Sequence, residues 1–226
     1  TLAENGTSVI VLERETIGWG ASSRNAGITG SSLKAGMPTI FKRYGKEYGL
    51  KFWESSLDML ELIKDLDNEE GVDFDWHQSG DLGLAFKASH FDSMVTRAKW
   101  SKDNLGGDVE IVPPSKMRTK IGSDAYHGGI IDKHGIGLHP AKLVFGLAEV
   151  AARKGALLCE EAGVFKIEKK AQGFILHTIK GVLKAKEIVV ATNGYTDRLV
   201  QKLNPKTFPV GSYSIVTEPL SKELQD

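Results

Sequence analysis

This sequence of 226 residues has a single cysteine, a formal net charge of zero and no long hydrophobic run. Cys159 is the only cysteine, so no internal disulfide can form, which is typical of proteins in a reducing compartment. Lys and Arg number 29, as do Asp and Glu, so no global field attracts nucleic acid or an anionic membrane. The apolar runs, such as residues 188–191, are far shorter than the roughly 18 residues of a membrane span. We expect a cytoplasmic globular protein that neither binds nucleic acid nor spans a membrane.

Motifs for metal binding and for nucleophilic catalysis are also missing. The six histidines show neither HExxH spacing nor a companion pair of cysteines, which argues against a zinc site. No G-x-S-x-G nucleophile elbow and no P-loop occurs. We therefore expect no metal, and the sequence names no catalytic residue.

The two ends of the sequence read as parts of interrupted elements. Residues 1–6 are typical of the last turn of a helix that Gly6 closes. Residues 213–220 predict a strand that runs into a turn, with no closing element after it. These ends predict an internal piece of a longer protein.

Two apolar runs predict strands that are buried on both faces of a parallel sheet. Residues 8–12 end at the carboxylate of Glu13, and residues 187–191 run into residues 192–195. Ligands of open α/β sheets collect at the carboxyl ends of the strands, where an acid can bind the ribose of a dinucleotide. The alternative is a plain surface glutamate, because any glycine-rich phosphate loop would lie upstream of Thr1.

Residues 18–32, which follow Glu13 closely, are rich in Gly, Ala and Ser. Small residues let a backbone approach a ligand closely. Arg24 could stabilise an anionic phosphate or a reduced ring, and Asn25 could form hydrogen bonds at the edge of a ring. An ordinary loop is the alternative, since the stretch becomes specific only through its position after the strand and the acid.

The rest of the sequence predicts an α/β protein with a second, α+β part. Amphipathic spacing predicts one or two helices over residues 39–66 and further helices over 89–104 and 140–154. Short strands are predicted at residues 82–86, 109–112, 156–159, 164–167, 174–178 and 182–183. Residues 74–131 alternate short strands with a helix, which indicates the second domain.

The order of these pieces resembles the D-amino-acid oxidase/glycine oxidase (DAO) superfamily of FAD-dependent oxidoreductases, and in particular its γ-glutamylputrescine oxidase-like branch. The resemblance rests on VIVLER at 9–14, GWGASSRNAG at 18–27, GLHP at 137–140, VVATNGYT at 189–196, and PVGSY with TEPL at 209–220. It covers essentially the whole chain. It implies that the chain lacks the G-x-G-x-x-G loop and the C-terminal part of the family, and that FAD binding without this loop is weak or absent.

The resemblance also implies a set of FAD-binding residues. Glu13 would bind the adenosine ribose, Arg14 would lie beside the adenine, and Val164 would meet the adenine through its backbone. The remaining residues would lie along the pyrophosphate and ribityl chain (Ala21, Ser22, Ser23), approach the isoalloxazine (Arg24, Asn25, Ala26, Gly27, Ile28) or close over the dinucleotide (Ala191, Thr192, Asn193, Gly194). Residues 1–73 and 138–204 would form a Rossmann-like FAD domain, and residues 74–137 and 205–226 an interleaved substrate domain.

The implied activity is oxidation of the C–N bond of an amine or amino acid to an imine, by hydride transfer to the flavin, with oxygen or another electron acceptor as the second substrate. The alternatives are a flavin monooxygenase that uses NAD(P)H, a nicotinamide-dependent dehydrogenase in which Glu13 binds the NAD ribose, and an inactive fragment or binding module without a cofactor.

Overall fold

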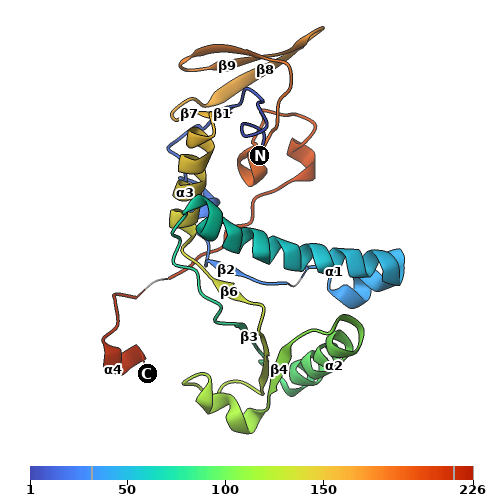
Figure 1. Ribbon diagram of the computed structural model, residues 1–226. Helices are drawn as coiled ribbons and strands as arrows, with labels where there is room; N and C mark the ends of the chain where they lie inside the picture. Colours follow the sequence, from blue (N-terminus) through green and yellow to red (C-terminus); the bar gives the residue numbers. More distant parts are fainter. Residues whose placement is uncertain (32, 216, 226) are drawn as a thin grey trace. The chain divides into compact units, whose positions relative to one another are not determined.

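The computed structural model describes residues 1–31, 33–215 and 217–225 (Figure 1). The chain divides into two compact units. Unit 1 comprises Thr1–Ala26 and Leu147–Asp226, and unit 2 comprises Gly27–Gly146. Helix α3 (Pro140–Arg153) carries the chain from unit 2 back into unit 1. Unit 2 is therefore inserted in the sequence of unit 1.

Unit 1 contains a parallel pair of strands, β1 (Ile10–Leu12) and β7 (Leu157–Cys159), in the register Ile10↔Leu157. The turn before β1 has the geometry of a helix end, because Asn5 N donates to Thr1 O at 3.0 Å and Gly6 has a φ of 77°. The predicted helix end at residues 1–6 is confirmed. Parallel pairing of strands on either side of a helix is typical of the α/β class that the sequence predicts.

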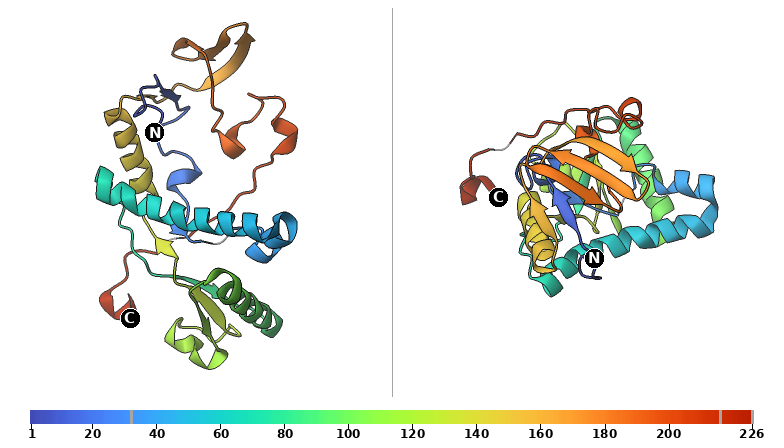
Figure 2. Two further views of the ribbon diagram at one scale, coloured as in Figure 1. Left: turned by 45° about the vertical axis from the view of Figure 1, so that its right-hand side comes forward. Right: turned by 90° about the horizontal axis from the view of Figure 1, so that it is seen from above.

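A three-stranded antiparallel sheet follows in unit 1, in the order β10-β9-β8. Its strands are β8 (Val164–Lys170), β9 (Gly173–Thr178) and β10 (Gly181–Ala185), which Figure 2 shows as one twisted meander. Gly173 and Gly181 stand at the two turns with positive φ angles of 118° and 141°, a conformation open to glycine. After the sheet come the 3₁₀ helices η3 (Asn193–Tyr195) and η4 (Asn204–Lys206) and helix α4 (Lys222–Gln225).

Three predictions about strands in unit 1 are wrong. Residues 187–191 form no strand, and Val189 is 85% exposed. Residues 213–215 and 217–220 are also irregular, with Tyr213 95% exposed, while Val216 lies outside the described residues. Strand β1 exists but is not buried on both faces, since Ile10 and Val11 are exposed. The common reason is that a strand needs neighbours for its hydrogen bonds and side chains, and among the described residues β1 pairs only with β7.

Unit 2 packs two helices against short sheets. Helix α1 (Met37–Glu70) bends at Gly45, whose φ of 82° is not helical, and α2 is Ala88–Leu105. Phe41 of α1 and Trp100 of α2 meet edge to face at 5.0 Å beside a core of Met37, Ile40 and Trp53. The predicted helices at 39–66, 89–104 and 140–154 are confirmed.

The sheets of unit 2 are antiparallel. Strands β3 (Asp81–Leu84), β5 (Gly129–Asp132) and β4 (Val109–Val112) pair in the order β3-β5-β4, and β2 (Ile28–Thr29) pairs with β6 (Ile136–Gly137). The 3₁₀ helix η2 (Pro114–Thr119) lies between β4 and β5 in the sequence. The predicted strands at 82–86 and 109–112 are confirmed. Across the described ranges, no helix is long and apolar enough to cross a membrane.

Candidate functional site

Four segments of unit 1 meet at the carboxyl end of β1. The first is Glu13, which β7 and the loop after it hold in place. Glu13 N donates to Cys159 O at 2.8 Å, and Ala162 N donates to Glu13 O at 2.7 Å. Its carboxylate Oε1 accepts a hydrogen bond from Glu15 N at 3.0 Å. Oε2 has no hydrogen bond within the described part of the chain. Glu13 thus keeps an acceptor for a ligand.

Arg14 connects the first segment to two others. Its Nη1 lies 3.5 Å from Asp197 Oδ2, and its Nε lies 3.2 Å from Glu15 Oε1. The side chain of Arg14 also lies against Gly163, where an added Cβ would come within 2.9 Å of Arg14 Cγ. Gly163 is followed by Val164, the first residue of the edge strand β8. The residues predicted to bind adenosine therefore lie beside one another.

Residues 18–25 form a short loop around the 3₁₀ helix η1 (Ala21–Ser23). Ser23 Oγ donates to Gly18 O, and Asn25 Nδ2 donates to Ser22 O at 2.8 Å. The guanidinium of Arg24 lies 5.3 Å from the ring centroid of Trp19, a cation–π distance. The loop is thus closed by its own side chains, and Arg24 is exposed at its surface.

The fourth segment, residues 191–197, lies beside this loop. Tyr195 meets Trp19 edge to face, with ring centroids 6.2 Å apart, and a Cβ on Gly20 would lie 3.5 Å from Tyr195. Thr196 Oγ1 donates to Asn193 O at 2.6 Å and lies 2.7 Å from Thr192 Oγ1. In the same segment Ala191 is exposed and Gly194 is half-buried. Sequence reasoning did not select Trp19, Tyr195 and Asp197, and only the neighbouring predicted residues hinted at them.

Gly27 and Ile28, which are predicted to approach the isoalloxazine ring, are the first two residues of unit 2. Gly27 has a φ of 66°, and an added Cβ would overlap the carbonyl oxygen of Leu138. Leu138 N donates to Gly27 O at 2.8 Å, and Ile28 continues this pairing in β2. Gly27 is thus fixed as glycine by both its backbone angle and its neighbour.

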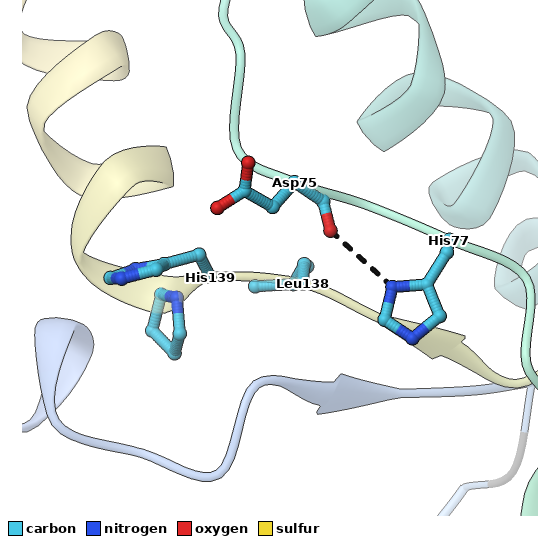
Figure 3. A pocket seen from close by; sticks show the side chains of 5 residues that line it. Asp75, His77, Leu138 and His139 are labelled. Atoms are coloured by element: carbon cyan, nitrogen blue, oxygen red, sulfur yellow. Dashed lines mark hydrogen bonds between the residues drawn. The ribbon is translucent and has the colours of Figure 1, made fainter. Parts of the chain in front are cut away.

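A shallow pocket of about 300 Å³ lies beside Leu138 (Figure 3). It is lined by Asp75, His77, Leu138, His139 and Pro140. The sequence analysis gave none of them a binding role, although the last three belong to the GLHP motif. A β-bridge between His77 and Gly137 brings the two histidines to the same pocket. Because this bridge joins segments 60 residues apart, the sequence shows each histidine only as an isolated residue.

Charge at the pocket is governed by Lys142, on the first turn of α3. Its Nζ lies 2.7 Å from Asp75 Oδ1, and this hydrogen bond holds the pKa of the Asp75 carboxyl below its usual range. The same bond, supported by Asp73, raises the pKa of Lys142. His77 Nδ1 lies 3.4 Å from Asp75 O, as Figure 3 shows. No group of three or more metal-ligating side chains is found among the described residues.

An acid at the end of a parallel strand, flanked by a small-residue loop, is typical of the α/β proteins that bind dinucleotides at the carboxyl ends of their strands. This is the class that the fold and the site define. Comparison with known families makes the class specific, because the family described as "DAO: FAD dependent oxidoreductase" matches residues 1–226. The chain belongs to this family of FAD-dependent oxidoreductases.

Individual relatives agree with the family. The chain is 31% identical over 230 residues to "Probable oxidoreductase OrdL" of Haemophilus influenzae, a match that covers 100% of this chain and 53% of the relative. It is 29% identical over 228 residues to "Gamma-glutamylputrescine oxidoreductase" of Escherichia coli, covering 99% and 52%. The chain therefore spans about half the length of these relatives.

Solved structures show the same fold. Glycine oxidase from Geobacillus kaustophilus superposes with a TM-score of 0.71 at 23% identity, over 89% of this chain and 53% of that one. The amino acid oxidase NikD superposes with a TM-score of 0.67 at 20% identity, over 89% and 49%. The predicted fold class and family are confirmed.

The residues present fit the adenosine end of FAD. A ribose offers two neighbouring hydroxyl donors, and Glu13 Oε2 is an acceptor without a hydrogen bond in the described structure. Beside it, Gly163 has no Cβ, so the side chain of Arg14 can lie against the backbone that leads to Val164. An accepting carboxylate, a donating guanidinium and a strand edge together match the hydrogen-bonding groups of a ribose and a purine.

Proposed function

We propose that the protein uses FAD to oxidise the C–N bond of an amine or amino acid. The observation that carries this proposal is the meeting of Glu13, Arg14, the loop at residues 18–25, Val164 and residues 191–197 in unit 1. Membership of the FAD-dependent family supports the cofactor. The names of its relatives, a gamma-glutamylputrescine oxidoreductase and a glycine oxidase, support an amine or amino acid as the substrate.

In this proposal Glu13 accepts hydrogen bonds from the ribose hydroxyls through its unengaged oxygen, since hydrogen bonds to a carboxylate are the stronger ones. Arg14 and the backbone of Val164 hold the adenine. The other proposed contacts are those along the pyrophosphate and ribityl chain (Ala21, Ser22, Ser23), around the ring (Arg24, Asn25, Ala26, Gly27, Ile28) and over the dinucleotide (Ala191, Thr192, Asn193, Gly194).

Bound FAD would accept the hydride that leaves the carbon next to nitrogen, while a proton leaves the nitrogen and the imine product is hydrolysed by water. The chain itself positions the substrate and FAD and supplies charge beside them. Arg24, exposed beside Trp19, would place a cation near developing negative charge. Oxygen or another electron acceptor is the proposed second substrate, and the cytoplasm the proposed location.

The proposal extends to the domains. Residues 1–73 and 138–204 would serve FAD, and residues 74–137 and 205–226 the substrate. The division into compact units at residues 26/27 and 146/147 follows packing and is a separate property from this functional assignment.

The visible absorption spectrum of the intact protein tests the proposal, recorded before and after anaerobic addition of a panel of amines and amino acids. We expect a flavin band that bleaches with at least one of them. A flavin band that bleaches only with NADPH would overturn amine oxidation in favour of a monooxygenase. A folded but colourless protein, also after incubation with FAD, would contradict the cofactor and leave Glu13 as a nicotinamide-binding or structural residue.

A further inference from the structure

Helix α1 exposes a line of large apolar side chains, here called the α1 stripe: Tyr48, Phe52, Met59 and Leu62, with the small Ser55 at its centre. Tyr48 is 59% exposed, Phe52 45% and Leu62 62%. Tyr48, Ser55 and Leu62 are seven residues apart, and Phe52 and Met59 stand between them on the same side of the helix. The stripe lies beside the buried line of the helix, which includes Trp53 and Leu60. It covers about 21 Å, since a helix rises about 1.5 Å per residue.

Acidic side chains border the second half of this stripe. Met59 and Leu62 share an open, shallow surface of α1 with Ser55, Asp58, Glu61 and Asp65. Glu61 is bound by Lys64, whose Nζ lies 2.7 Å from Glu61 Oε1. Asp58 and Asp65 have no ion pair within the described ranges of the chain. This surface therefore fits a partner that is apolar along its centre and basic at its edge.

The first half of α1 has this basic character. Lys51 precedes these acidic residues on the same helical segment, and it makes an exposed contact with Glu47 at 2.9 Å. A helix dipole favours acids near the N-terminus and bases near the C-terminus, whereas α1 has no acid in its first turn and no base in its last. The stability of an isolated helix does not account for this reversed order. An antiparallel neighbour with the same order of charges does.

We infer that the α1 stripe is the interface for a second copy of this chain, with the two α1 helices antiparallel about a two-fold axis at Ser55. The small side chain at the axis allows the helices to approach. Tyr48 then faces the partner's Leu62, and Phe52 faces the partner's Met59. Such an interface is self-complementary and closes after two copies.

One pair of charges would flank each half of this interface. Lys51, four residues before Ser55, faces the partner's Asp58, three residues after it. The contact of Lys51 with Glu47 is exposed on both sides, so it competes weakly with the new pair. The inference does not depend on the proposed function, because no FAD-binding residue belongs to α1.

A charge swap tests the inference by sedimentation equilibrium of the intact protein. We expect a dimer for the parent, and we expect K51E and D58K each to weaken it about tenfold or more, because each puts like charges opposite one another. The double variant K51E/D58K, and an equimolar mixture of the two single variants, should restore the dimer. Residues 51 and 58 are two helical turns apart and do not meet within one helix, so this rescue must occur between copies.

Lys46→Glu is the matched control. It makes the same charge change on the same helix, two residues before Tyr48 and so on the other side. We expect it to leave the dimer within about twofold, the effect of a distant exposed charge. A parent that stays monomeric at high concentration, an equal effect of K46E and K51E, or a double variant as monomeric as the single ones would each overturn the inference. The inference also fails if the protein is a monomer and L62E destabilises its fold, because another part of the protein would then cover the stripe.

Discussion

Ser31 and Asp132, 101 residues apart in the sequence, are joined by a hydrogen bond of 3.1 Å from Ser31 Oγ to Asp132 Oδ2. The other carboxylate oxygen, Oδ1, lies 3.0 Å from His134 Nδ1 and accepts a hydrogen bond from His134 N at 3.0 Å. The carboxylate therefore stands between the hydroxyl and the imidazole, whereas a catalytic triad has the histidine in the middle. This cluster fastens Ser31, two residues after β2, to the end of β5 and does not activate a nucleophile.

Removing the Asp132 carboxylate should destabilise the protein, because the hydroxyl of Ser31, a residue only 1% exposed, would lose its hydrogen-bond acceptor. We expect Asp132→Ala to lower the free energy of unfolding by about 1–3 kcal/mol, because a buried hydroxyl loses its partner. In Ser31→Ala/Asp132→Ala that hydroxyl is gone, so the double variant should lose less than the sum of the single ones. Urea unfolding of all four proteins measures this. Strict additivity would show that the two side chains do not interact.

Gly27 should tolerate no side chain. In Gly27→Ala the new Cβ overlaps Leu138 O in a backbone with a φ of 66°, so we expect a loss of about 3 kcal/mol or more in the free energy of unfolding. Gly36→Ala is the control, because Gly36 has a φ of 69° but no atom within 4 Å of the added Cβ. Only the cost of the positive φ, about 1–2 kcal/mol, remains there. Similar losses in the two variants would contradict a steric role for Leu138.

Glu13→Gln should weaken FAD binding by about tenfold to a hundredfold, since a neutral amide replaces a carboxylate that accepts ribose hydrogen bonds. The amide oxygen can still accept from Glu15 N, so folding should be preserved. Fluorescence titration of FAD into the cofactor-free intact protein gives the affinity. Glu15→Gln removes a neighbouring charge and should change the affinity less than about threefold. Equal effects of both substitutions would assign the loss to net charge instead of ribose contacts.

Glu168 should make unit 1 sensitive to acid. Hydrogen bonds from Lys166, Lys170 and His177, at 2.7 to 2.9 Å, lower the pKa of Glu168 from 4.5 to about 2. A lowered folded-state pKa stabilises the protein above the unfolded value, and the stabilisation is lost as the pH falls from about 4.5 to about 2.

Thermal unfolding between pH 2 and pH 7 shows this loss. Glu168→Gln should be less stable than the parent at neutral pH, and the difference should shrink below about pH 4.5. Glu187→Gln, an exposed glutamate of unit 1, is the control and should follow the parent curve. A difference between Glu168→Gln and the parent that stays constant over this range would contradict the role of the carboxylate charge.

Local signals in the sequence were sufficient for most elements of the fold. Apolar periodicity and a closing glycine define α3, and the turn at Gly181 separates β9 from β10. The predicted strand at residues 187–191 fails because its sequence specifies only that it should be buried. A buried strand depends on neighbouring strands, which no local pattern can supply.

The candidate site was predictable only in part. Glu13 and the loop after it were identifiable because they are adjacent in sequence and follow a strand. The contact of Trp19 with Tyr195 and the ion pair of Arg14 with Asp197 join segments more than 170 residues apart. The pocket histidines, His77 and His139, likewise depend on pairing across the β-bridge at Gly137. FAD binding by the predicted residues stays a prediction.

The pairing of Ile10 with Leu157 has a consequence for synthesis on the ribosome. Strand β1 emerges first, yet its partner β7 follows about 150 residues later, which takes roughly 7–30 s at about 5–20 residues per second. Unit 2 is translated entirely within this interval. The nascent chain therefore has the whole of Gly27–Gly146 available to fold before β1 can pair with β7. A chaperone that shields β1 during that time would protect this pairing.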